Sequence, residues 1–151
     1  MKAKELMIDD WVLIDRPDKY AGAKAQIKSL IFHKEDDGQY FSAFIHDELG
    51  IVRREVFNED LRPIPLTAEI LEKNGFVANK HVYPYPYYEY TNEEDKVKVG
   101  FAFPQGNRTS YKEPWVYIDS ENVFIEHLPC IFVHQLQQIL RFCGITLNIE
   151  V

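Results

Sequence analysis

The sequence predicts an α+β fold that is mainly β, with an N-terminal SH3-like small β-barrel followed by an antiparallel sheet that carries one packed C-terminal helix. Three observations predict this class. Tyr and Phe dominate the aromatic residues, which make up 14% of the chain, and both favour sheets. The first part of the chain holds short strand patterns at close spacing. A short helix pattern with both ends marked then separates this part from a second β-rich stretch, so we expect two domains, residues 1–66 and 67–151.

The first domain is expected to contain four or five strands joined by tight turns. Residues 35–38 suit a hairpin turn, because Gly38 adopts a positive φ without strain. Residues 47–50 suit a second tight turn. The expected strands are residues 11–15, 25–32, 39–46, 51–57 and, between two prolines, 61–64. Strands of this length and spacing are typical of a small closed barrel, for which we prefer the SH3-like form.

A capped helix is predicted over residues 68–74. Thr67 is a good N-cap, because its hydroxyl accepts a hydrogen bond from a backbone N–H of the first turn. Leu66 and Leu71 are spaced as a hydrophobic staple. Gly75 takes the left-handed conformation that ends a helix. We expect this segment to be a rigid spacer between the two domains.

The second domain is expected to contain antiparallel strands. Residues 87–91 follow a proline-containing stretch, and residues 96–103 alternate between polar and apolar side chains. Residues 115–119 and 122–126 are predicted to form two further strands or one interrupted strand. The apolar face of the best alternating segment consists of Val97, Val99, Phe101 and Phe103.

A helix is predicted over about residues 130–143, ending at Gly144, and a C-terminal strand over residues 145–151. At ~100° per residue, the apolar side chains of the helix fall on one side. They are Phe132, Val133, Leu136, Ile139, Leu140 and Cys143. We expect this side to pack on the sheet.

The chain is acidic throughout, with a net charge of −7. Residues 1–66 hold 10 Lys and Arg against 13 Asp and Glu, and residues 67–151 hold 7 against 11. A large phosphate-binding surface needs concentrated positive charge, so nucleic acid is a less expected partner than protein.

The sequence also predicts a cytoplasmic location and no contact with a membrane. No segment has the roughly eighteen consecutive apolar residues of a membrane span, and the start lacks the apolar core of a signal peptide. Cys130 and Cys143 bracket one predicted helix, where a rise of ~1.5 Å per residue separates them by about 20 Å. A disulfide needs Cα atoms within ~7 Å, so we expect free thiols, as in a reducing compartment.

The tyrosine-rich segment, residues 83–90, is the first candidate binding surface. Tyr83, Tyr85 and Tyr87 offer flat, amphipathic area on which a protein partner, a sugar or a base stacks. The alternative is a structural role, in which these aromatic side chains form an edge strand that covers a small core. If the segment binds, the acidic charge favours a protein over nucleic acid.

The polar side of the C-terminal helix is the second candidate. His134 and Gln138 are four residues apart, as are Gln137 and Arg141, so each pair meets on the helix surface. One hypothesis is a row of recognition side chains that contacts a partner, and the other is an ordinary solvated face.

Catalytic and metal-binding patterns are weak. The spacing of His127, Cys130 and His134 permits a zinc cluster but lacks the usual arrangement of zinc ligands. Neither a phosphate-binding loop nor a nucleophile elbow occurs in the sequence. We therefore expect no catalytic residue, no metal and no cofactor, and hence a protein that is not an enzyme.

Three motifs resemble those of a family of small uncharacterised bacterial proteins that are commonly encoded in or near prophages and mobile elements. The motifs are residues 2–12, 63–76 and 132–144, and they span the chain in the expected order. Asp9-Asp10 departs from the Gly-Asn of the family at this place. The resemblance implies a cytoplasmic, phage-related accessory protein, and it implies no catalytic residue.

Together these observations predict a non-enzymatic interaction module that binds another protein or self-associates. The rival hypothesis is a nucleic-acid-binding protein that acts through the SH3-like barrel.

Overall fold

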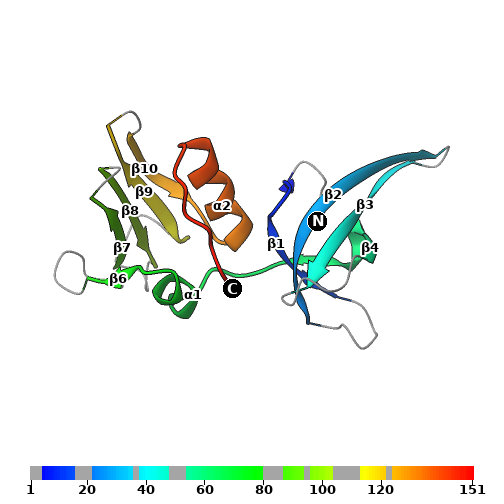
Figure 1. Cartoon of the computed structure of the whole chain (residues 1–151), viewed down its shortest axis with the longest axis horizontal. Coiled ribbons are helices and arrows are strands. Elements are labelled where there is room, and N and C mark those ends of the chain that lie inside the picture. Colours follow the sequence, from blue (N-terminus) through cyan, green and yellow to red (C-terminus); the bar gives the residue numbers. More distant parts are fainter. Residues whose placement is uncertain are drawn as a thin grey trace. The chain divides into compact units, whose positions relative to one another are not determined.

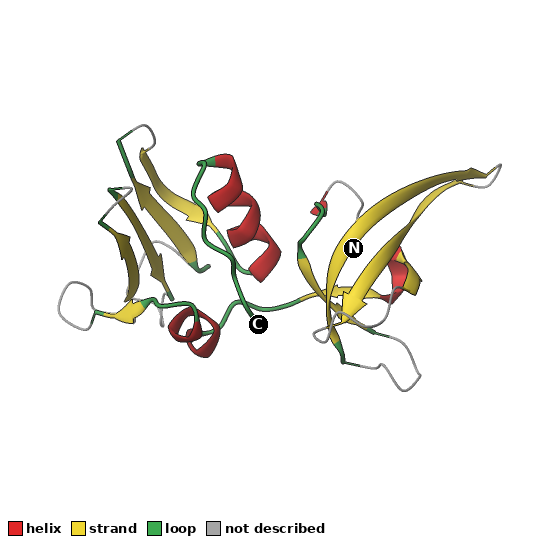
Figure 2. Cartoon of the chain, in the orientation of Figure 1, coloured by secondary structure: helices red, strands yellow, loops and turns green. Residues whose placement is uncertain are grey.

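The computed structural model describes residues 5–15, 22–35, 38–47, 54–79, 87–93, 96–103, 113–121 and 124–151. The chain forms two compact units, residues 1–64 and 65–151. Within the described residues, each unit contains one five-stranded antiparallel sheet, and the second also contains two α-helices (Figures 1 and 2). The predicted α+β, mainly β class is therefore confirmed.

The first unit is a meander of four strands followed by a fifth strand, which returns to pair with the first strand. Its strand order is β4-β3-β2-β1-β5. The strands are β1 (Trp11–Ile14), β2 (Lys24–Glu35), β3 (Gly38–Asp47), β4 (Arg54–Phe57) and β5 (Leu61–Pro63), with the short 3-10 helix η2 (Asn58–Asp60) before the last. The pairings leave β4 and β5 as the two edges, so the sheet is not closed and the predicted SH3-like barrel is not confirmed.

The core of the first unit lies on one side of this sheet. Its buried members are aliphatic, namely Leu6, Val12, Ile14, Ala25, Ile27, Ala43, Ile45, Val56 and Leu61. The turn before β1 adds a buried polar group, because the Asp10 carboxylate accepts a hydrogen bond from the Met7 N–H at 2.8 Å. Asp9 has φ +68°, the left-handed conformation in which glycine is unstrained.

The second unit has the strand order β10-β9-β8-β7-β6. Its elements are α1 (Ala68–Lys73), β6 (Val77–Ala78), β7 (Tyr87–Asn92), β8 (Val97–Ala102), β9 (Trp115–Asp119), β10 (Phe124–Pro129) and α2 (Val133–Phe142). Of the four side chains predicted on the apolar face of residues 96–103, Val97, Val99 and Phe101 are buried and Phe103 is half-buried, and Gly100 and Ala102 are buried as well. Figure 1 shows α2 lying over one face of this sheet.

Both ends of helix α1 have the capping interactions that the sequence predicts. The Thr67 hydroxyl accepts a hydrogen bond from the Ile70 N–H at 3.4 Å, and Leu66 and Leu71 are both buried. Gly75 has φ +81°, and the N–H of Phe76 donates to the Leu71 carbonyl at 3.0 Å. The helix belongs to the second unit, and its last residue is one position before the predicted end.

Helix α2 begins three residues later than predicted. Pro129 is the last residue of β10, and the backbone at Phe132 forms an isolated β-bridge with Pro65. The side-chain oxygen of Gln135 then accepts hydrogen bonds from the N–H groups of Ile131 and Phe132, at 2.8 and 3.1 Å. These bonds satisfy donors that the helix start would otherwise leave without partners.

The predicted C-terminal strand is wrong, although the predicted alternation is right. Residues 145–151 form no strand. Ile149 and Val151 are buried, whereas Thr146, Asn148 and Glu150 are exposed. The segment runs back alongside α2 (Figure 1) and is bonded to α1. Alternation determines which side chains face inward, but a strand also needs a free sheet edge to pair with.

None of the helices in the described ranges is long and apolar enough to cross a bilayer.

Candidate functional site

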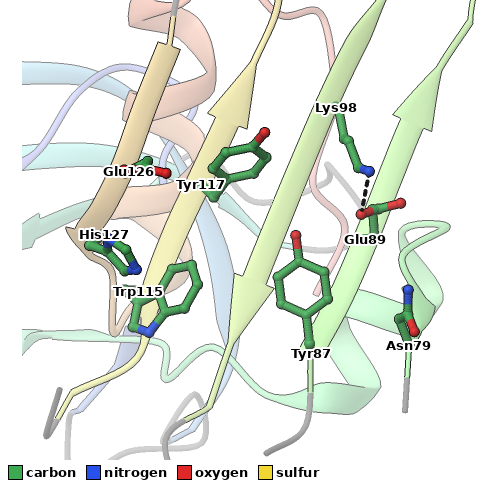
Figure 3. Close-up of a pocket in the computed structure, with 8 residues that line it drawn as sticks. All are labelled: Asn79, Tyr87, Glu89, Lys98, Trp115, Tyr117, Glu126 and His127. Atoms are coloured by element: carbon green, nitrogen blue, oxygen red, sulfur yellow. Dashed lines mark ion pairs between the residues drawn. The ribbon is translucent and has the colours of Figure 1, made fainter. Parts of the chain in front are cut away.

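A pocket of about 300 Å³ lies on the face of the second sheet opposite to α2. Its lining comes from all five strands or the residues next to them, and consists of Asn79, Tyr87, Glu89, Lys98, Trp115, Tyr117, Glu126 and His127 (Figure 3). Side chains alternate across a strand, so these residues face away from the apolar face that α2 covers.

Strand register builds the pocket from three neighbouring strands. In β8, Ala102 pairs with Tyr87 on one side and Trp115 on the other. Gly100 likewise lies between Glu89 and Tyr117. At these two positions the middle strand contributes the smallest side chains, and the two outer strands contribute the larger ones, while Lys98 of the middle strand also lines the pocket.

Half of the lining residues are aromatic, namely Tyr87, Trp115, Tyr117 and His127. The Trp115 ring lies 6.4 Å from the Tyr87 ring and 4.5 Å from the His127 ring, measured between centroids. The pairing of β10 with β9 shifts register between Ile125 and Leu128, and His127 in this bulge has φ +56°. A bulge re-aims the side chain that it contains, and here it places the imidazole against Trp115.

The polar contacts at the pocket include an ion pair and a hydrogen bond. The Lys98 ammonium lies 2.9 Å from a Glu89 carboxylate oxygen, and the Tyr117 hydroxyl donates to Asp119 at 3.2 Å. The hydrogen bond to Glu89 raises the pKa of Lys98. Desolvation, followed by the negative charge of Asp119, raises the pKa of Tyr117. At neutral pH the site therefore holds a protonated amine and a neutral phenol.

Of the tyrosines predicted to bind, Tyr87 lines the pocket and is buried at 5% exposure. Tyr83 and Tyr85 lie outside the described residues. Tyr88, the next residue in β7, is also buried, on the opposite face of the sheet. The described end of the segment thus contributes both to the core and to the pocket.

The predicted row of recognition side chains on α2 is not a continuous surface. His134 and Gln137 are buried, at 4% and 5% exposure, Gln138 is half-buried and Arg141 is exposed. The prediction of a solvated polar face is therefore wrong for His134 and Gln137. Helix α2 is covered by the sheet and also by the C-terminal segment (Figure 1), so its buried side is wider than packing on one sheet requires.

The three residues whose spacing permits a zinc cluster are not assembled. His127 lies in the pocket, while the His134 ring stacks on Phe132 at 5.7 Å. Cys130 is fully buried, and burial raises the pKa of its thiol to about 12. Within the described ranges, no three His, Cys, Asp or Glu side chains form a group that would hold a metal ion. Cys130 and Cys143 are both free cysteines.

A second polar cluster crosses the first sheet. The Ser42 hydroxyl donates to a Glu55 carboxylate oxygen at 2.5 Å, and the His33 Nε2 lies 2.9 Å from the same hydroxyl. Because that hydroxyl proton goes to Glu55, the His33 Nε2–H is the donor in the second bond. A nucleophilic serine must instead give its proton to the histidine. Ser42 is also fully buried, so the cluster is structural.

Most pocket residues were not identified from the sequence. Alternation in residues 96–103 drew attention to the apolar face, whereas the pocket lies on the other face and includes Lys98. The same alternation in residues 115–119 places Trp115 and Tyr117 on one face of the predicted strand, and this shared face is the sequence pattern that indicates these two pocket residues. The bulge at His127 left no comparable signal.

Comparison of the chain with protein-family models, curated proteins and solved structures gave no match. The site is therefore judged from its own geometry. A pocket lined by aromatic and charged side chains is suited to binding a ligand by contact area and hydrogen bonds.

Proposed function

We propose that this protein is a non-enzymatic interaction module that binds another protein through the pocket face of its second sheet. The observation that carries the proposal is the gathering of Tyr87, Trp115, Tyr117 and His127 around one pocket on the sheet face opposite to α2. Aromatic side chains present large contact area at low entropic cost, and they are enriched in the centres of protein interfaces.

The protonation states in the pocket support binding over catalysis. A general base or a nucleophile at neutral pH needs a pKa near 7 or a neighbouring group that takes its proton. The pKa of Lys98 and that of Tyr117 are both raised further above this range. Both groups keep their protons and act as hydrogen-bond donors.

For the first unit we propose an SH3-like arrangement. The meander of β1 to β4 and the return of β5 to β1 support it. A nucleic-acid site on this unit is the rival function, and a gel shift over a series of salt concentrations tests it. Binding that weakens steeply with salt supports the rival, and no shift at low salt removes it.

The three motifs that resemble prophage-associated proteins support a role as a cytoplasmic accessory protein of a phage or mobile element. This part of the proposal rests on the sequence resemblance alone. Expression of the chain during induction of a phage or element that encodes it tests this role.

Selection of peptides from a random display library on the full chain tests the protein-binding function. We expect selected peptides to bind the wild type and to lose affinity for Tyr117→Leu. The control is Phe142→Leu, because Phe142 is 88% exposed on α2, outside the pocket. A selection that yields no binder, or yields binders that Tyr117→Leu does not weaken, contradicts the proposal.

The pocket face of the second sheet is also suited to binding a second copy of the chain. Sedimentation velocity over a range of concentrations distinguishes this self-association from binding to a different protein. A dimer that Tyr117→Leu dissociates assigns the face to a second copy of the chain.

A further inference from the structure

We infer that the pocket on the second sheet takes a cationic side chain, a lysine or an arginine, from a basic segment of the partner protein. The inference rests on the proposed function and specifies the chemistry of the group that enters the site. Two independent features of the pocket carry it, its charge and its aromatic walls.

The charged groups at the pocket are mostly acidic. Glu89, Glu126 and the adjoining Asp119 carry negative charge, and Lys98 carries the positive charge among these four. The potential at the site is therefore negative even with Lys98 in place. Desolvation is the largest cause of the raised pKa of Tyr117, and the charges of Asp119 and Glu126 raise it further, while Lys98 lowers it.

The charges lie side by side on neighbouring strands, because Lys98 of β8 pairs in register with Asp119 of β9 and forms an ion pair with Glu89 of β7. Glu126 projects from β10 beside Tyr117 (Figure 3). Asp119 accepts the hydrogen bond of the Tyr117 phenol. The single positive charge of Lys98 thus lies among three carboxylates, and an entering cation balances the excess negative charge.

Aromatic rings lie next to this group of charges. Phe124 packs edge-on against Tyr117, with ring centroids 5.8 Å apart and planes at 90°, and it is 64% exposed. Tyr117 itself is half-buried. Aromatic faces next to carboxylates attract lysine and arginine through cation–π contacts and charge together. The same negative charge disfavours phosphate and other anions.

Titration of the isotopically labelled full chain, followed by NMR, tests the inference. The probes are N-acetyl-arginine amide, N-acetyl-lysine amide and the neutral analogue N-acetyl-citrulline amide. We expect the two cations to shift the Trp115 indole signal and the amide signals of Glu89 and Tyr117. Citrulline, which has the shape of arginine without its charge, is expected to shift them far less. Added salt should weaken the cation effect.

Charge-removing variants locate the cation. Asp119→Asn and Glu126→Gln each keep a side-chain acceptor, and each should weaken arginine binding about two- to fivefold, the effect of one exposed ion pair. Glu150→Gln removes the same charge from the exposed C-terminal segment and should leave the affinity unchanged.

Equal shifts with arginine and citrulline, or the absence of shifts with either cation, overturn the inference. A failed inference remains distinguishable from a failed function. If the display selection yields neutral or acidic peptides that Tyr117→Leu weakens, the face binds protein and the cation assignment alone is wrong. If a neutral sugar shifts the same signals as strongly as arginine, the cation assignment is again wrong.

Discussion

The hydroxyl end of Tyr87 occupies the space above Gly100 in β8. A Cβ atom on residue 100 would overlap that hydroxyl and would lie only 2.6 Å from the Cζ atom of the ring. The backbone of Gly100 has no unusual φ, so the requirement for glycine here is steric. The absent side chain allows the Tyr87 ring to lie across the neighbouring strand and close one wall of the pocket.

Replacing Gly100 with alanine is therefore expected to destabilise the second unit and to move the Tyr87 ring. Overpacking of this kind costs about 1–3 kcal/mol of unfolding free energy. Denaturant unfolding of Gly100→Ala measures the cost. The cost should fall in a Tyr87→Ala background, where the overlapping group is gone, and equal costs in both backgrounds would contradict this steric explanation.

Asp9 permits a matched test of backbone strain in the turn before β1. It combines φ +68° with an ion pair to Lys28, in which Nζ and Oδ1 are 2.6 Å apart. Asp9→Gly and Asp9→Ala both remove the ion pair, but only glycine adopts a positive φ without strain. We expect Asp9→Gly to be more stable than Asp9→Ala by about 1 kcal/mol in denaturant unfolding. Equal stability would mean that the turn is not held in the left-handed conformation.

The two cysteines should differ in reactivity. Burial raises the pKa of Cys143, which is half-buried, and raises that of the fully buried Cys130 to about 12. The thiolate is the reactive form, so both should react more slowly with iodoacetamide than a cysteine in a peptide. Cys143 should react first, and its rate should still be rising between pH 8 and pH 9, because more of its thiol becomes thiolate over this range.

Mass spectrometry of the native full chain identifies the labelled cysteine. Cys143→Ser is the control, since it should remove the faster reaction. Labelling of Cys130 before Cys143 would contradict the burial of the former.

At the scale of elements, the side chain of Asn74 links helix α1 to the C-terminal segment. The Asn74 side chain donates to the Glu150 carbonyl and accepts from the Glu150 N–H, both at 2.7 Å. It also donates to the Ile70 carbonyl at 2.7 Å, so it links the end of the helix to the segment. Lys73 adds a hydrogen bond from its ammonium to the Val151 carbonyl at 3.0 Å.

Asn74→Ala should release the C-terminal segment. The loss of the two hydrogen bonds to Glu150 should lower the free energy of unfolding by about 1–3 kcal/mol. Hydrogen exchange at the Glu150 amide should become much faster than in the wild type. The control is Glu72→Ala, an exposed position on the same helix, which should leave that amide protected. Unchanged exchange in Asn74→Ala would show that the apolar contacts of Ile149 and Val151 are sufficient.

Elements defined by local chemistry were the most predictable. The cap at Thr67 and the turn at Gly75 depend on residues close together in the chain, and α1 was located to within one residue. The start of α2 was misplaced because the backbone at Phe132 pairs with Pro65, which is distant in the sequence. His134 and Gln137 were misassigned for a similar reason, since the C-terminal segment that covers α2 was expected to join a sheet.

At the scale of the whole molecule, each unit has its own sheet and its own core. The pocket needs the register of five strands and one bulge, and register cannot be deduced from alternation alone. The sequence accordingly identified Tyr87 as a binding candidate but not its neighbours Trp115 and Tyr117. The acidic composition was informative at this scale, because the negative charge of the chain recurs at the pocket.

The central claim is that the pocket face of the second sheet is the surface that binds a partner. The most direct measurement is the affinity of one display-selected peptide for the wild type, Tyr117→Leu and Phe142→Leu, by calorimetry on the full chain. We expect Tyr117→Leu to bind at least fivefold more weakly than the wild type, since truncating a central interface aromatic costs more than about 1 kcal/mol. Phe142→Leu should bind as the wild type does. Equal affinity in all three proteins, or a loss confined to Phe142→Leu, would contradict the claim.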